Sequence, residues 1–255
     1  MARLSERLSY ARSLLVTAPL IFLYTGVMGT LSLAGSFVDS RGRFQHGCSR
    51  IWAKMILWTA RVRVRVYGLE HVQQGMPYVL CVNHQSHMDT PIVLAALPFQ
   101  FRFTPKKQLF RYPFLGWHLR RSGQLAIDRE RPVAALRSLT EAADSIRKGS
   151  PVVIFPEGGT SRDGSIKPFK GGGFMLAMKA NAQLVPVTIR GSRPVLVPKT
   201  YHVKGGSVEV IIGKPISSEG ESVSDLAKRV REEIVQTFNH GKTLDRNTYP
   251  VPREV

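Results

Sequence analysis

The amino-acid sequence predicts an α/β fold: a layered, largely parallel sheet with flanking helices, joined to an N-terminal membrane-associating helical segment. From residue 60 onwards, short apolar or alternating runs follow one another with helical patterns between them. This alternation is typical of a parallel sheet covered by helices. Residues 13–38, in contrast, contain no charged side chain. We therefore divide the chain into an anchor at 1–60 and an α/β domain at 61–255.

Composition and charge narrow the class of protein. The chain has 255 residues, of which 43% are hydrophobic, so it can bury a core and is not disordered. Its formal net charge of +18 predicts attraction to anionic lipid, nucleic acid or a phosphorylated substrate, although a merely solvated basic surface is the alternative. The two cysteines, Cys48 and Cys81, form no disulfide framework and no CxxC metal signature, which fits a reducing compartment.

The uncharged run at 13–38 is long enough to enter a membrane. At about 1.5 Å per helical residue it covers a bilayer core of roughly 30 Å. Pro19, Gly26, Gly29 and Gly35 interrupt it, and arginines flank both ends, so the charge pattern selects no orientation. Three interpretations stay open: a single transmembrane helix, a bent insertion into one leaflet with both ends cytoplasmic, and a cleavable signal peptide. The run is long for a signal peptide, which disfavours the last.

A second stretch, "RIWAKMILWTARVRVRV", also has the character of a membrane-surface segment. Ile51, Met55 and Trp58 share one helical face, with Trp52 towards one edge and Lys54 towards the other. Tryptophan beside basic side chains suits the lipid headgroup layer. An ordinary amphipathic helix packed on the domain explains the pattern equally well, and both interpretations stay open.

The remaining elements follow from periodicity, capping and turn residues. The helix that starts near residue 89 takes Asp89 or Thr90 as its cap and Pro91 in its first turn. The last helix carries an apolar stripe, and the tail at 246–255 is predicted to be a surface extension. Strands are predicted at 60–68, 78–83, 123–129, 151–155, 183–191 and 207–216, and helices at 89–97, 132–147 and 171–182, with the stripe of the last helix at Leu226, Val230, Ile234 and Phe238.

Two polar clusters follow predicted strands, where the chemistry of such folds gathers. The first is "NHQSHMD", residues 83–89. On an ideal helix His84 and Asp89 would point about 140° apart, so they meet only if the chain turns before the helix begins. Asp89 would then hold one imidazole nitrogen and leave the other as a base. Alternatively, Asp89 is a helix cap and His84 a hydrogen-bonded turn residue.

The second cluster is "FPEGGTSRDGSIKPFKGGG", residues 155–173. It holds six glycines together with Arg162, Lys167 and Lys170. Glycine lets backbone amides approach an anion and the cations add charge, although a flexible surface loop is the alternative. Between the two clusters, residues 103–129 are rich in Lys, Arg and aromatic side chains, which is typical of a basic amphipathic face and suits a lipid surface.

These blocks resemble the glycerophospholipid acyltransferase family, in particular its bacterial 1-acyl-sn-glycerol-3-phosphate acyltransferases. "NHQSHMD" matches the NHxxxxD signature, and "KKQLFRYPFLG" followed by "IDR" matches the second block. "FPEGGTSRDG" resembles the FPEGTRS-type third block, and "LVPVTI" matches the fourth. The four blocks occur in order between residue 83 and about residue 190. One departure is that Gly159 and Thr160 stand where the family has Thr-Arg, and the next arginine is Arg162.

The resemblance implies acyl transfer from acyl-CoA or acyl-ACP to the free hydroxyl of 1-acyl-sn-glycerol 3-phosphate, giving phosphatidic acid. His84 would be the general base and Asp89 would orient its imidazole. It implies no metal and no cofactor apart from the acyl co-substrate. The expected partners are the lysophospholipid acceptor, the acyl carrier and an anionic membrane surface, with no nucleic acid, at the cytoplasmic face of the inner (plasma) membrane. The substrate-binding candidates are Asn83, Lys106, Lys107, Arg129, Glu157, Gly158 and Arg162; the four cations among them are candidates for the acceptor phosphate.

Other functions remain as alternatives. A different lysolipid could be the acceptor. A serine hydrolase would use Ser86, but GxSxG is absent. A nucleic-acid binder would explain the charge, but no recognition motif is present. A non-catalytic basic membrane tether would explain the anchor and the charge, but not four ordered blocks.

Overall fold

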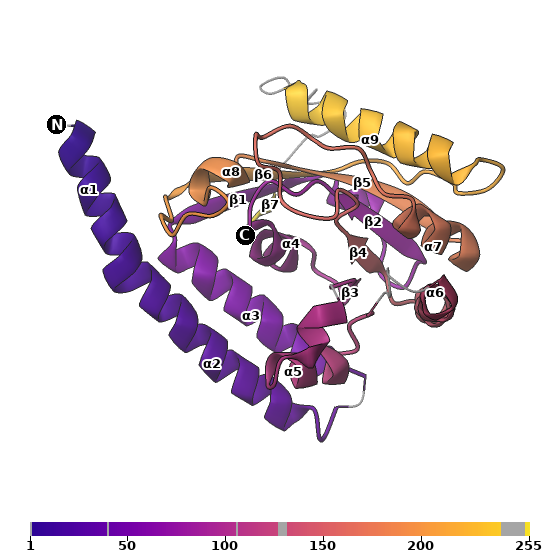
Figure 1. Ribbon diagram of the computed structural model, residues 1–255, viewed down its shortest axis with the longest axis horizontal. Helices are drawn as coiled ribbons and strands as arrows, with labels where there is room; N and C mark the ends of the chain where they lie inside the picture. Colours follow the sequence, from indigo (N-terminus) through magenta and orange to yellow (C-terminus); the bar gives the residue numbers. More distant parts are fainter. Residues whose placement is uncertain (1, 40, 106, 127–131, 241–252) are drawn as a thin grey trace.

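The computed structural model describes residues 2–39, 41–105, 107–126, 132–240 and 253–255. Its centre is a seven-stranded sheet with the order β3-β4-β2-β5-β6-β1-β7 (Figure 1). The β3–β4, β4–β2, β2–β5 and β6–β1 pairs are parallel, whereas β5–β6 and β1–β7 are antiparallel, which confirms a largely parallel sheet. The strands are β1 (Val62–Tyr67), β2 (Tyr78–Val82), β3 (Arg102–Phe103), β4 (Val152–Ile154), β5 (Gln183–Arg190), β6 (Gly206–Ile212) and β7 (Arg253–Glu254).

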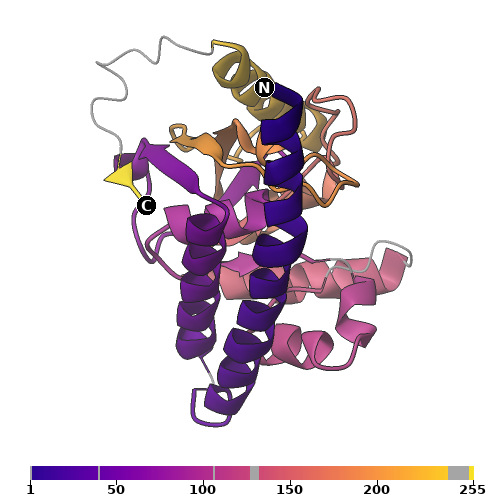
Figure 2. The ribbon, with the colours of Figure 1, turned by 90° about the vertical axis from the view of Figure 1, so that its left-hand side faces the viewer.

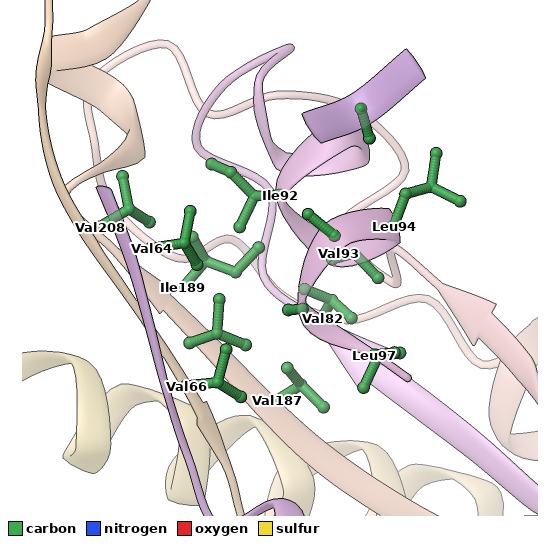
Figure 3. Close-up of a cluster of buried hydrophobic side chains, with 14 of the residues drawn as sticks. Val64, Val66, Val82, Ile92, Val93, Leu94, Leu97, Val187, Ile189 and Val208 are labelled. Carbon is green, nitrogen blue, oxygen red and sulfur yellow. The ribbon is translucent and has the colours of Figure 1, made fainter. Parts of the chain in front are cut away.

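Helices cover both faces of the sheet, and a separate hydrophobic cluster fills each side. On one face, α3 (Arg43–Thr59) and α4 (Asp89–Ala96) pack on β1, β2, β5 and β6. On the other, α6 (Pro132–Arg147), α7 (Gly172–Ala180) and α9 (Val223–Asn239) pack on β2, β4 and β5. Figure 3 shows the first cluster, in which Ile92 and Leu97 at α4 meet Val82, Val187 and Ile189 of the sheet. These side chains are at most 1% exposed, and each contributes about 1.5–3 kcal/mol by burial.

Most predicted elements are confirmed, and the exceptions have physical reasons. The stripe on α9 is buried at Leu226, Val230 and Ile234. The strand predicted at 123–129 is wrong for residues 123–126, which follow α5 (Leu115–Arg121) without forming a strand; the rest of it lies outside the described residues. Gly123 turns there with φ +69°. Strands β3 and β7 were not predicted, because two residues carry no periodicity.

The N-terminal helix is continuous, contrary to the expected interruptions. It runs through α1 (Ala2–Arg12), the π-helical turn Ser13–Thr17 and α2 (Ala18–Gly35). The π-turn lies just before Pro19, which has no N–H, and the Ala18 N–H donates to the Ser13 carbonyl instead. Within the segment Ser5–Gly35, a window of 18 residues has a mean hydropathy of 1.8 and is only 11% buried, so by length and composition the segment is able to cross a membrane. Figure 2 shows it lying alongside α3.

Helix α3 has one face packed on the domain and an opposite face with large exposed apolar side chains. Ala53, Ile56 and Leu57 are buried in the core beside β1, so α3 packs on the domain. Ile51 and Trp58, on the other hand, are 54% and 78% exposed. The helix therefore joins the domain to α2 while it presents an apolar surface outwards.

Candidate active site

The His84–Asp89 pair forms at the carboxyl end of β2. His84 Nδ1 lies 2.9 Å from Asp89 Oδ2. A non-helical turn separates β2 from α4, so that Asp89 stands at the first position of α4 and reaches back to the imidazole. Because Nδ1 faces the carboxylate, Nε2 is the nitrogen left to accept a proton. The prediction that the two side chains meet is confirmed.

Asp89 holds more than the imidazole. Its Oδ2 also accepts the backbone N–H groups of Gln85 at 2.7 Å and Ser86 at 2.9 Å. The prediction that Asp89 or Thr90 caps α4 is wrong, because the cap position is Met88 and no side chain caps the helix there. The carboxylate is instead turned towards the loop before the helix. With an exposed fraction of 0%, it fixes the loop and the base at once.

Two residues that follow β4, Phe155 and Glu157, contact His84. The imidazole stacks on Phe155, with ring centroids 4.2 Å apart and planes at 24°, and its side chain is 15% exposed. The His84 N–H donates to Glu157 Oε1 at 2.6 Å, and the Lys167 N–H donates to Glu157 Oε2 at 3.0 Å. Burial raises the pKa of Glu157 above its ordinary value, while the two amide hydrogen bonds oppose that shift. Glu157 is thus a buried link between the histidine loop and the glycine-rich loop.

The glycine-rich loop is held in place through hydrogen bonds to its main-chain atoms. The Ser161 N–H donates to the His84 carbonyl at 2.8 Å. Arg193 donates to the carbonyls of Ser161 at 2.9 Å and Arg162 at 2.5 Å. From α9, Arg231 donates to the carbonyls of residues 166 and 167. The loop therefore lies at the surface, and hydrogen bonds from Ser161, Arg193 and Arg231 attach it to the rest of the domain.

The structure gives the sequence-predicted substrate residues different settings. Arg162 is exposed on the glycine-rich loop. Gly158 has φ +78°, and a Cβ there would meet Lys170 Nζ at 2.8 Å, so this position favours glycine. Lys107 begins the 3₁₀ helix Lys107–Arg111 and is half-buried. Lys106 and Arg129 lie outside the described residues.

Asn83 has a structural role in place of the predicted substrate contact. Its amide is fully buried, with its Nδ2 donating to the Ile189 carbonyl at 3.0 Å and its Oδ1 accepting the Ile189 N–H at 2.7 Å. Both polar atoms are therefore used to join the end of β2 to β5. Sequence reasoning missed Phe155, Arg193 and Arg231, because stacking and donation to carbonyls leave no motif.

The neighbouring polar residues do not form a second catalytic arrangement. Ser86 is fully buried and donates its hydroxyl to the Leu196 carbonyl at 2.7 Å, so it does not serve as a nucleophile activated by His84. His87 is exposed. Within the described ranges, no group of three or more His, Cys, Asp or Glu is placed to bind a metal ion. The arrangement is a positioned base without a protein nucleophile, suited to proton removal from a substrate hydroxyl.

Comparisons with known proteins identify the family to which this fold and site belong. The family model described as "Acyltransferase" matches residues 63–190, and the chain belongs to that family. The "1-acyl-sn-glycerol-3-phosphate acyltransferase" of Pseudomonas aeruginosa is 30% identical over 240 residues, covering 90% of this chain and 91% of its own. The crystal structure of the "1-acyl-sn-glycerophosphate (LPA) acyltransferase, PlsC," from Thermotoga maritima shares the fold, with a TM-score of 0.73, 24% identity, and coverage of 93% and 96% of the two chains.

Plant relatives are longer than this chain. The "1-acyl-sn-glycerol-3-phosphate acyltransferase BAT2, chloroplastic" of Brassica napus is 30% identical over 201 residues, which is 78% of this chain. The chain covers 57% of that relative and 56% of "LPAT1, chloroplastic" of Arabidopsis thaliana. It therefore spans less than two thirds of the length of these curated relatives.

His84→Ala is expected to lower kcat for acyl transfer by about 10²–10⁴-fold, the usual contribution of a positioned base. Asp89→Asn is expected to lose much of the activity too, because a neutral amide no longer stabilises the imidazolium that forms when His84 takes the proton. His87→Ala is the matched control and should retain activity, since that side chain is exposed. Steady-state kinetics with circular dichroism as the folding check decides this. An inactive His87→Ala beside an active His84→Ala would reverse the assignment.

Glu157→Gln is expected to lower kcat, because its amide nitrogen would face one of the two backbone N–H groups that the carboxylate now accepts. It should also change the pH dependence of stability. The pKa of Glu157 is raised above 4.5, so between that value and the raised one the folded chain holds more protons than the unfolded chain. The free energy of unfolding of the wild type therefore falls as pH rises through this window, and the variant lacks that fall.

The matched control for Glu157 is Glu233→Gln on α9. Burial also raises the pKa of Glu233, so both variants should flatten the slope of the unfolding midpoint against pH. Only Glu157→Gln should lower kcat, because only Glu157 is bonded to the His84 main chain. Wild-type kcat in Glu157→Gln would mean that the link does not position the base.

Proposed function

We propose that the protein transfers a fatty acyl group from acyl-CoA or acyl-ACP to the free hydroxyl of 1-acyl-sn-glycerol 3-phosphate, giving phosphatidic acid. The observation that carries the proposal is the 2.9 Å pair of His84 and Asp89 beside a pinned, glycine-rich loop that bears an exposed arginine. Its relatives' names point to the same acceptor.

The mechanism follows from the nitrogen that Asp89 leaves free. His84 Nε2 takes the proton of the acceptor hydroxyl as its oxygen attacks the thioester carbonyl. The tetrahedral intermediate then expels the thiolate, and the imidazolium returns the proton to its sulfur. Asp89 stabilises the imidazolium and keeps Nδ1 protonated. No acyl-enzyme forms, because the acceptor oxygen is itself the nucleophile.

The acceptor phosphate is assigned to cations of the glycine-rich loop and of the second block. Arg162 and Lys107 belong to the two blocks that surround the site, and Lys106 and Arg129 are further candidates from the sequence. A guanidinium fork suits a phosphate monoester, whereas Thr160 offers one neutral hydroxyl. The substitution of Gly159 and Thr160 for the family's Thr-Arg is also what favours the second candidate, transfer to a different lysolipid.

The direct test of the activity is an acceptor screen with the purified protein. Lysophospholipids that differ in headgroup are supplied with acyl-CoA and, separately, with acyl-ACP, and thioester consumption and products are followed by mass spectrometry. Phosphatidic acid from 1-acyl-sn-glycerol 3-phosphate supports the proposal. Membrane binding with no turnover of any lysolipid would leave a non-catalytic tether.

Arg162→Ala is expected to raise the KM for 1-acyl-sn-glycerol 3-phosphate by about ten- to a hundredfold, since a charge-assisted contact contributes about 1.5–3 kcal/mol. The KM for the acyl thioester should stay near the wild-type value. A phosphate-free monoacylglycerol acceptor is the control and should be insensitive to the change. If Arg162→Ala uses the phosphorylated acceptor as well as wild type does, Arg162 is only a surface charge.

The N-terminal segment is proposed to hold the protein on the cytoplasmic leaflet with both of its ends cytoplasmic. Arg3→Cys and Lys54→Cys, labelled in sealed vesicles of known orientation, should both react from the cytoplasmic side only. Cys48 and Cys81 are buried, so the native thiols give a low background. Labelling of position 3 from the opposite side alone would establish a full crossing of the membrane.

A further inference from the structure

We propose that the second-block segment, η3 (Lys107–Arg111) with α5 (Leu115–Arg121), is a second membrane-contacting element. It lies in the lipid interface beside α2 and brings Lys107, a candidate for the acceptor phosphate, to the bilayer. This inference rests on the proposed membrane association of the protein, and it adds a surface on the α/β domain itself to the N-terminal helix.

The segment presents an unusual set of apolar side chains to the outside. Tyr112 is 60% exposed, Trp117 59%, and Leu115 40%. All three lie within six residues of chain. They are not packing defects, because the turn that carries them is built tightly: a Cβ on Gly116 would lie 2.2 Å from the Phe110 carbonyl. The fold therefore holds a cluster of large apolar groups outwards.

This surface is continuous with the apolar N-terminal helix. Any side chain at Gly29 of α2 would collide with the Phe114 ring, at 2.8 Å, so α5 sits directly against α2. Ser32 Oγ and His118 Nδ1 lie 3.0 Å apart in the same contact. Just beyond α2, the Arg121 guanidinium lies 4.9 Å over the ring of Phe37, itself 79% exposed. Figure 1 shows α5 beside the C-terminal half of α2.

The chemistry of the surface fits a lipid leaflet as the occupant. The exposed face of α2 continues the apolar area with Phe22, Leu23, Val27 and Leu31. Tyrosine and tryptophan flanked by arginines are typical of the headgroup layer, where the rings bury an apolar body and the cations meet phosphate. Arg111 and Arg121 are both exposed at the ends of the segment. The net charge of +18 adds attraction to an anionic membrane.

The consequence concerns how the acceptor reaches the base. Lys107, a candidate for the acceptor phosphate, is the first residue of η3, and so it lies in the same short segment as Tyr112 and Trp117. A lysolipid held in the leaflet would therefore meet the second block at the lipid interface. Its phosphate can be bound there while its acyl chain remains in the membrane, so the whole molecule need not enter water.

The test uses the full chain in vesicles of phosphatidylethanolamine and phosphatidylglycerol that carry brominated acyl chains. The protein has three tryptophans, so Trp52→Phe with Trp58→Phe leaves Trp117 as the single fluorophore. Two probes are placed in a background in which all three tryptophans are Phe. Phe22→Trp on the exposed face of α2 is the positive probe, and Lys228→Trp on the exposed face of α9 is the negative probe.

Trp117 is expected to be quenched to an extent close to the Phe22→Trp probe and far above Lys228→Trp. Quenching of Trp117 only at the level of Lys228→Trp, with Phe22→Trp strongly quenched, overturns this inference and leaves the membrane anchor intact. If Phe22→Trp is not quenched either, the proposed membrane association itself fails. Trp117 shielded from aqueous acrylamide but unquenched by brominated lipid would instead mean that a second copy of the chain covers the surface.

A kinetic measurement keeps the inference testable in a second way. The double variant Tyr112→Ser/Trp117→Ser is expected to raise the apparent KM for a long-chain acceptor presented in vesicles, by about an order of magnitude, because each lost aromatic group weakens contact with the interface. For a short-chain, water-soluble acceptor the KM should be unchanged. An equal rise for both acceptors would indicate damage to the site and contradict a lipid-contact role.

Discussion

One carboxylate oxygen, Asp89 Oδ2, determines the geometry on which the site depends. It accepts hydrogen bonds from Nδ1 of the His84 imidazole and from the backbone N–H groups of residues 85 and 86, so a single buried carboxylate satisfies three donors. A carboxylate with no exposure is costly unless it is paired in this way. The requirement is mutual, because the turn between β2 and α4 needs an acceptor and the anion needs donors. Five residues of spacing allow both, which explains why the histidine and the aspartate stand so far apart in sequence.

Glu157 is a second buried carboxylate that accepts backbone N–H groups, and it connects two loops. It joins the main chain of His84 to that of Lys167, and Ser161 in turn donates to the His84 carbonyl. Arg193 then holds the carbonyls on the far side of the loop. These contacts hold backbone atoms of the loop, and Lys167 adds its own side chain, whose Nζ donates to the Thr160 carbonyl at 3.1 Å. Arg162 itself is exposed on this loop.

The sequence predicted the parts of the protein that leave a local pattern. The buried runs of β2 and β5, the stripe on α9, and the possibility of the His84–Asp89 pair all follow from spacing and periodicity. The π-turn before Pro19 was hidden, because proline in a long apolar run fits a break as well as a wider helical turn. The role of Asn83 was also hidden, since an amide that replaces strand hydrogen bonds has the same letter as one that binds a substrate. The hydrogen bonds that Arg193 and Arg231 donate to loop carbonyls could not be predicted either, because they depend only on where the fold places these side chains.

The order of the strands explains why blocks far apart in sequence meet at one point. Strands β4, β2 and β5 are neighbours and parallel, so their carboxyl ends lie at the same edge of the sheet. His84 follows β2, Glu157 follows β4, and Ile189, which holds Asn83, lies in β5. At the far edge, β3 pairs with β4 and leads directly into η3, so the second block starts from the same group of parallel strands. The segment that contacts α2 is thus connected through β3 and β4 to β2, the strand that His84 follows.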